Sequence, residues 1–132
     1  MIKASELRIG NLVEYKPYAN QDGEVVTIQG ILGTKAYFSK YSNESGMYHY
    51  LEPIPITEEW LVKLDFKMMP IGKYQNWGNW SLENGRHFVS YDDRTDTKGF
   101  SYNGCTLWHP TEFVHQLQNL YFAFTGEELI LK

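Results

Sequence analysis

The dipeptide Asn103-Gly104 is the feature that most constrains the fold, because it stands between two apolar runs. Asn-Gly tolerates the positive φ angles of a tight type I′ turn, and it is the strongest short-range indication of a β-hairpin. Residues 99–102 and 105–108 are therefore predicted to be antiparallel strands. Residues 75–82 and 86–91 precede this hairpin and are predicted to add two further strands to the same sheet.

The first 52 residues also show a β pattern. Residues 24–32 are rich in β-branched side chains, which favour strands. The predicted strands are residues 12–15, 24–32, 35–39 and 47–51, separated by short polar turns. Four short strands at this spacing are typical of a small curled antiparallel sheet, of which an SH3-like barrel is the simplest version.

A short helix is predicted between the two β regions. The two prolines of residues 52–56 remove backbone donors, so this segment is interpreted as an extended connector. Thr57 is a suitable N-cap, and Glu58 and Glu59 occupy the first turn, where the helix dipole favours acids. The helix is predicted to end near Leu64.

The longest predicted helix covers residues 111–124. Its apolar side chains recur at helical spacing and predict one buried stripe. The members of this stripe are Phe113, Leu117, Leu120, Tyr121 and Phe124. Gly126 follows at a position suited to a helix C-cap, and residues 127–132 are predicted to add a short final strand.

Together these elements predict an α+β fold. A chain of 132 residues suits one domain, and we expect residues 1–132 to form it. Its N-terminal subregion, residues 1–52, is predicted to be the small antiparallel, SH3-like sheet. In the second subregion, residues 53–132, the short helix leads into an antiparallel β region on which the C-terminal helix packs.

Charge and cysteine content narrow the functional classes. The net charge of −4 argues against a non-specific nucleic-acid binder, which normally carries a basic face. Cys105 is the only cysteine, so no intramolecular disulfide can form, and we interpret it as a small, unreactive core residue. The N-terminus has no apolar leader and no window reaches 18 apolar residues, so we expect a cytoplasmic protein without a membrane span.

No set of residues has the spacing of a metal or catalytic site. Cys105, His109 and His115 lack the C-x2-C or i, i+4 spacing of zinc ligands. The acids of residues 92–96 lack the glycine and distal glutamate of an EF-hand loop. We therefore expect no metal, no cofactor and no catalytic residue.

The most informative feature is a concentration of aromatic residues between positions 74 and 108. About half of the side chains on alternating strands face outward, and exposed Trp and Tyr are common at interfaces. The candidate binding face is Trp77, Trp80, Tyr91, Tyr102 and Trp108. Two alternatives stay open: the C-terminal helix covers most of these aromatic rings, or the rings stack on nucleic-acid bases or carbohydrate.

Three stretches of sequence carry a resemblance to a known family. They are KASELRIGNLV at residues 3–13, PIPITEEWL at residues 53–61 and VHQLQNLYFAFTGEEL at residues 114–129. Taken together they resemble a family of small uncharacterised proteins from bacteriophages and from the genomes of gut anaerobes. The resemblance implies a cytoplasmic protein of phage or mobile-element origin, and it assigns no catalytic residue.

These observations favour a non-catalytic accessory or binding protein that acts through protein–protein contacts. The alternative is a nucleic-acid-associated module that uses the N-terminal SH3-like sheet. A third class, an enzyme with an unrecognised site, also stays open at this point. The partner is expected to be a protein rather than nucleic acid or a membrane, and the sequence does not fix the oligomeric state.

Overall fold

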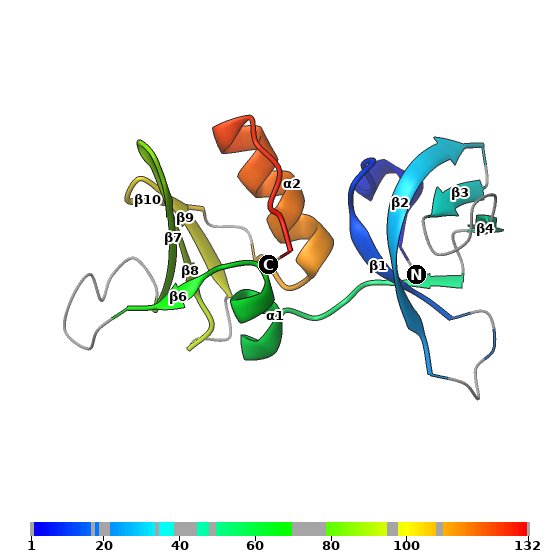
Figure 1. Cartoon of the computed structure of the whole chain (residues 1–132), viewed down its shortest axis with the longest axis horizontal. Helices are drawn as coiled ribbons and strands as arrows, with labels where there is room; N and C mark the ends of the chain where they lie inside the picture. Colours follow the sequence, from blue (N-terminus) through cyan, green and yellow to red (C-terminus); the bar gives the residue numbers. More distant parts are fainter. Residues whose placement is uncertain are drawn as a thin grey trace. The chain divides into compact units, whose positions relative to one another are not determined.

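The fold is α+β and contains two antiparallel sheets and two α-helices (Figure 1). The structure is a computed structural model that describes residues 2–16, 18, 22–33, 35–38, 45–47, 50–69, 79–94, 98–107 and 110–131. Its contacts divide the chain into two compact units. The first unit contains Met1–Pro55 and Phe113–Asn119, and the second contains Ile56–Glu112 and Leu120–Lys132. The predicted fold class is confirmed, whereas the single domain stays a prediction.

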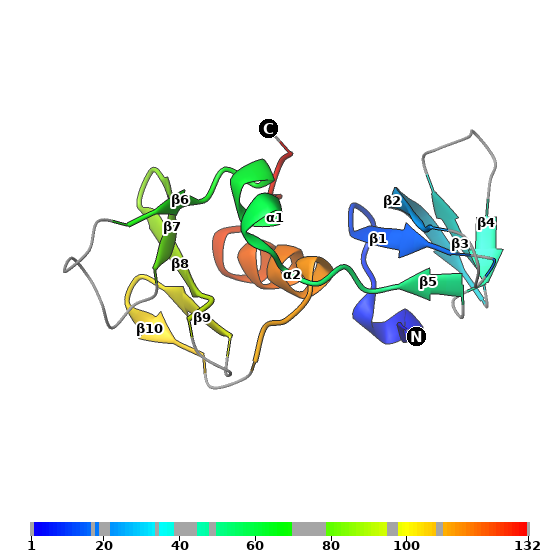
Figure 2. The same ribbon diagram turned by 90° about the horizontal axis from the view of Figure 1, so that it is seen from below.

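The first unit contains a five-stranded sheet in the order β4-β3-β2-β1-β5 (Figure 2). Its elements are the 3-10 turn η1 (Ala4–Glu6), β1 (Leu12–Tyr15), β2 (Glu24–Leu32), β3 (Lys35–Phe38), β4 (Ser45–Met47) and β5 (Leu51–Glu52). The prediction of one strand over residues 47–51 is wrong. Met47 ends β4 and Leu51 begins β5, and these strands lie at opposite edges of the sheet, so the chain must leave one edge before it reaches the other.

One face of this sheet forms the apolar core of the first unit. Val13 lies opposite Val26, and Ile28 lies opposite Phe38, and all four are buried. The ring of Tyr15 packs against that of Phe38, with 4.8 Å between the ring centroids. The sheet is antiparallel as predicted, and its SH3-like character stays a prediction.

The second unit begins with the predicted short helix, α1 (Glu58–Lys63). The Thr57 hydroxyl accepts a hydrogen bond from the Trp60 amide at 3.3 Å, which confirms Thr57 as the N-cap. Lys63 forms an i, i+4 ion pair with Glu59 at 3.1 Å. A second five-stranded sheet follows in the order β10-β9-β8-β7-β6. Its strands are β6 (Lys67–Met68), β7 (Trp80–Asn84), β8 (His87–Asp92), β9 (Gly99–Tyr102) and β10 (Cys105–Thr106).

The register of the second sheet separates aromatic from hydroxyl side chains. Trp80, Tyr91 and Phe100 lie opposite one another on β7, β8 and β9, and therefore share one face. The neighbouring row, Ser81, Ser90, Ser101 and Thr106, occupies the other face. The predicted hairpin turn is confirmed, because Asn103 and Gly104 have φ angles of 48° and 87°.

Helix α2 (Val114–Thr125) is the predicted C-terminal helix, but it begins three residues late. Phe113 forms an isolated β-bridge with Pro55, so the chain is still extended there and the helix cannot begin at residue 111. Leu117 and Tyr121 are buried as predicted, whereas Phe124 is 40% exposed. Gly126 has a φ of 75° and donates its amide to the Phe122 carbonyl at 2.8 Å, as expected of a C-cap glycine.

The segment after α2 differs from the prediction. Residues 127–131 form no strand, because they pair with no strand in the described part of the chain. Leu129 is nevertheless buried, so this tail packs against the second unit through its side chains. No helix among the described residues combines the length and apolar character needed to cross a bilayer.

Candidate functional site

The predicted aromatic binding face divides into core residues and one surface residue. Trp80 and Tyr91 are 3% and 1% exposed, so their assignment to an exposed face is corrected to the core. The reason is the register, which places both rings on the same face of the sheet as Phe100 and Tyr102. Phe124 of α2 packs against Phe100 and Tyr102 on that face. Tyr102 is only half-buried. The other two candidates, Trp77 and Trp108, lie outside the described residues.

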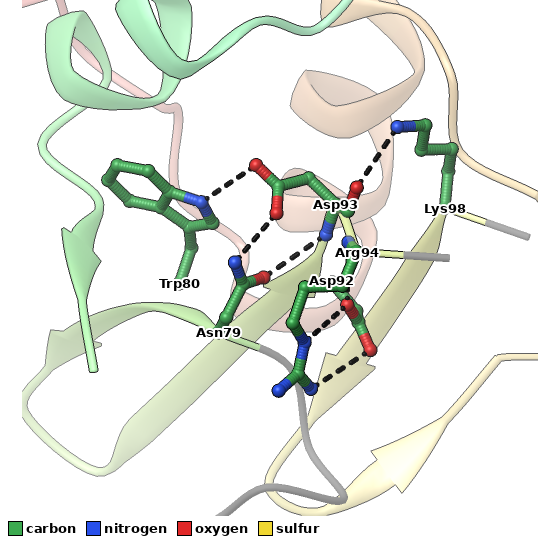
Figure 3. A network of polar contacts seen from close by, with 6 residues as sticks. All are labelled: Asn79, Trp80, Asp92, Asp93, Arg94 and Lys98. Atoms are coloured by element: carbon green, nitrogen blue, oxygen red, sulfur yellow. Dashed lines mark hydrogen bonds and ion pairs between the residues drawn. The ribbon is translucent and has the colours of Figure 1, made fainter. Parts of the chain in front are cut away.

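A polar network fixes the ring of Trp80 (Figure 3). The indole Nε1 donates to one carboxylate oxygen of Asp93 at 3.0 Å, and the Asn79 side-chain amide donates to the other at 2.6 Å. The Asp93 amide in turn donates to the Asn79 side-chain oxygen at 3.1 Å, and the Lys98 ammonium donates to the Asp93 carbonyl at 3.1 Å. Both carboxylate oxygens of Asp93 therefore bind donors within the protein, which is a structural role.

Asp92 is the second acid of the same loop. Burial acts to raise the pKa of Asp92, but hydrogen bonds from the Arg94 amide and guanidinium outweigh it, so that the pKa is lowered. The Arg94 side chain is largely exposed, so solvent screens this pair and it contributes little to stability. No three His, Cys, Asp or Glu side chains among the described residues are placed to hold a metal ion.

Among the described residues of the second unit, the pKa of Tyr91 is strongly shifted. Burial raises the pKa of its phenol strongly, and the negative charges of Asp93, Glu112 and Asp92 raise it further. The phenol donates a buried hydrogen bond to the Thr111 carbonyl at 2.7 Å. Tyr91 is therefore a neutral donor that holds the segment before α2 in place.

A pair of aromatic rings remains at the surface of the second unit. Tyr102 stacks on Phe124, with 5.1 Å between the ring centroids and 24° between the planes. The Tyr102 hydroxyl lies 2.6 Å from Nδ1 of His87 in a hydrogen bond. We call Tyr102, Phe124 and His87 the aromatic surface. Sequence reasoning missed Phe124 because the helical spacing assigned it to the buried stripe, and it missed His87 because no sequence pattern pairs it with Tyr102.

Cys105 lies directly opposite Tyr102 in the register. Its side chain is exposed, so its interpretation as a core residue is wrong. The physical reason is its place on β10, which is an edge strand and packs against a neighbour on one side only.

Polar side chains of α2 fasten the N-terminal segment in the first unit. The Gln118 side chain accepts from the Leu12 amide at 2.8 Å and donates to the Gly10 carbonyl at 3.1 Å. The Asn119 side chain donates to the Glu6 carbonyl at 2.9 Å and accepts from Asn11 at 2.8 Å. These contacts join residues 3–13 to residues 114–129, which are the first and last of the three family-like stretches. The residues that form these contacts therefore have a structural role.

The middle stretch reaches the same helix through backbone contacts. The Val114 amide donates to the Ile54 carbonyl at 2.8 Å, next to the bridge between Pro55 and Phe113. The three family-like stretches therefore contribute to one structural junction at the start of α2.

His115, which the sequence analysis weighed as a possible metal ligand, is a buried histidine. It is 2% exposed, its ring stacks on Phe113, and neither of its ring nitrogens has a hydrogen-bond partner among the described residues. Burial lowers the pKa of His115, and the negative charge of Glu6 acts in the opposite direction without reversing the shift. The imidazole is consequently held in its neutral form.

The lowered pKa of His115 predicts an acid-sensitive stability. Unfolded histidine binds a proton near pH 6.5, whereas the folded state resists protonation. The stabilisation is therefore complete above about pH 6.5 and is lost as the pH falls below it, by at most about 1.4 kcal/mol per pH unit. Urea unfolding of the wild type and of H115F at pH 7.5 and 5.5 should show a smaller acid loss in the variant. Equal losses in the two proteins would show that His115 is not the responsible group.

One face of the first sheet carries two neighbouring carboxylates. Glu14 on β1 lies directly opposite Glu52 on β5 and Val25 on β2, and these side chains share one face of the sheet. Two adjacent carboxylates repel a phosphate backbone. This arrangement does not favour the nucleic-acid alternative.

Comparison with protein-family models, with curated proteins and with solved structures finds no match to the chain. The resemblance to proteins of bacteriophages and gut anaerobes therefore stays a prediction. The functional interpretation consequently rests on the geometry described above.

Proposed function

We propose that this chain is a non-catalytic accessory or binding protein that acts in the cytoplasm through protein–protein contacts. Its phage or mobile-element origin is part of the proposal and rests on the three family-like stretches. The observation that carries the proposed function is the stacked pair of Tyr102 and Phe124 at the surface of the second unit.

This pair has the properties of an interface anchor. Aromatic side chains supply large contact area at a low cost in conformational entropy, and they are enriched at the energetic centres of interfaces. The stack on Phe124 and the hydrogen bond to His87 restrict the Tyr102 ring before any partner binds. A restricted side chain loses less entropy on association, which favours affinity.

Two polar side chains described in the second unit have structural roles. The Tyr91 phenol and both Asp93 carboxylate oxygens form hydrogen bonds within the protein. Two hollows among the described residues of the second unit measure about 220 and 230 Å³, below the 300–1,000 Å³ that is common for small-molecule sites. Each of these two hollows suits contact with a macromolecule better than enclosure of a substrate.

The proposal predicts that F124S reduces partner capture about tenfold or more while the protein stays folded. The serine removes half of the ring stack at a position that is already 40% exposed, so the fold should tolerate it. The measurement is affinity capture from nuclease-treated lysate of cells that produce the protein, with folding checked by circular dichroism.

The matched control for this prediction is F122S, on the same helix at 39% exposure. It should leave capture unchanged. Equal losses of capture in the two variants would contradict a specific role for the Tyr102–Phe124 pair. Capture that disappears on nuclease treatment would favour the nucleic-acid alternative.

A further inference from the structure

Strand β7 is covered unequally along its two edges. Strand β8 pairs with all five residues of β7, whereas β6 pairs only with Trp80 and Ser81. Asp65, with a φ of 69°, turns the chain after α1, and the chain joins the sheet only at Lys67. In the described part of the chain no strand therefore pairs with residues 82–84 on the β6 side. Such an edge presents backbone donors and acceptors to which an extended segment can add.

Two hollows flank this open edge. One has a volume of about 220 Å³ and is lined by Lys67, Ser81 and Glu83, which point to one face of the sheet. The other has a volume of about 230 Å³ and lies beside Leu82 and Asn84, which point to the opposite face. The residues that line both hollows are Asp65, Leu82 and Glu83. Each hollow has room for a side chain, and the two lie where successive side chains of an added strand would point.

The lining of the hollows combines an apolar floor with acidic groups. Leu64 and Leu129 contribute apolar surface to the second hollow. Asp65, Glu83 and Glu128 contribute carboxylates to the two hollows, against the single ammonium group of Lys67. The site is therefore complementary to side chains with an aliphatic stem and a positive head, which are lysine and arginine.

We infer that the open edge of β7 binds an extended basic segment of a partner protein, which adds to the sheet as a further strand. The segment's backbone forms hydrogen bonds with the amide and carbonyl of Glu83, since Leu82 and Asn84 pair with β8, and its side chains alternate between the two hollows. Lysine or arginine stems pack on Leu82, and their charged heads meet the carboxylate of Glu83, which lines both hollows. A second copy of this chain is a poor occupant, because it would bring one Glu83 towards another.

The two hollows share no lining residue with the aromatic surface, so the inference goes beyond the proposed function. The two can also fail independently. F124S should bind a lysine-rich peptide as well as the wild type does, even where the variant no longer captures its cellular partner.

The test uses two capped ten-residue peptides, one alternating lysine with valine and one alternating glutamate with valine. Alternation places lysine at one of the hollows in either register. The wild type should bind the lysine peptide saturably in fluorescence anisotropy and should not bind the glutamate peptide. E83K should weaken this binding about tenfold or more, whereas E24K, an exposed strand glutamate of the first unit, should not change it.

Hydrogen exchange on the wild type separates strand addition from general charge attraction. The Glu83 amide should exchange more slowly when the lysine peptide is bound. The inference is overturned by equal binding of both peptides, by equal weakening in E83K and E24K, or by an unchanged Glu83 amide in a saturated complex. The inference would also be overturned if sedimentation showed that the protein is a dimer and that the dimer does not bind the lysine peptide. In that case a second copy of the chain would occupy the edge of β7.

Discussion

L117A is expected to destabilise the protein by about 2–5 kcal/mol. Leu117 is fully buried on α2, and truncation to alanine removes apolar contacts and leaves a cavity where its side chain packed. The free energy of unfolding, measured by urea titration, gives this value directly. The control is L32A on β2, where the leucine is 72% exposed and truncation should cost well under 1 kcal/mol. A midpoint for L117A that matches the control would mean that α2 does not pack as described.

Q118M is expected to lower the free energy of unfolding by the second largest amount, after L117A. Methionine keeps the length of the side chain but removes both hydrogen bonds, which leaves the Leu12 amide and the Gly10 carbonyl without partners. The Leu12 bond is buried and the Gly10 bond is only partly buried, so the loss should be about 1–3 kcal/mol, the cost of one unsatisfied buried polar group. The measurement is again the free energy of unfolding.

The control for Q118M is Q29M, since Gln29 is exposed on β2. Amide exchange adds a local readout, because the Leu12 amide should exchange faster in Q118M than in the wild type. A variant as stable as the wild type, with unchanged exchange at Leu12, would contradict the fastening role of Gln118.

The parts of the fold that follow from short-range chemistry could be predicted from the sequence. Thr57 caps α1 through a hydrogen bond to an amide three residues away. Asn103-Gly104 turns the chain within the hairpin itself, and Gly126 ends α2 through its own positive φ. These residues act on neighbours in the sequence, so the local pattern contains the needed information.

The burial of the aromatic rings could not be predicted, because strand alternation does not say which face is covered. Trp80 and Tyr91 share a face by register, and α2 packs where that face also carries Phe100 and Tyr102. One indication was present in the sequence. Ser81, Ser90 and Ser101 alternate with these aromatics, and their small hydroxyl side chains mark the opposite face.

The burial of two polar residues of α2 could not be predicted from the sequence for a related reason. Helical spacing identifies apolar stripes, but Gln118 and His115 are buried beside such a stripe. Gln118 is accommodated because backbone groups of Gly10 and Leu12, more than 100 positions away in the chain, complete its hydrogen bonds. Only the tertiary structure supplies those partners.

The central claim, that the aromatic surface contacts a protein, is tested most directly by photo-crosslinking. Benzoylphenylalanine in place of Phe124 reacts only with groups that touch its ring, and the same group in place of Phe122 is the control. The account predicts that irradiation in cells joins the position-124 probe to a discrete protein of defined mass, and that the position-122 probe gives no such product. Products from both positions alike, or nucleic acid joined at position 124, would contradict it.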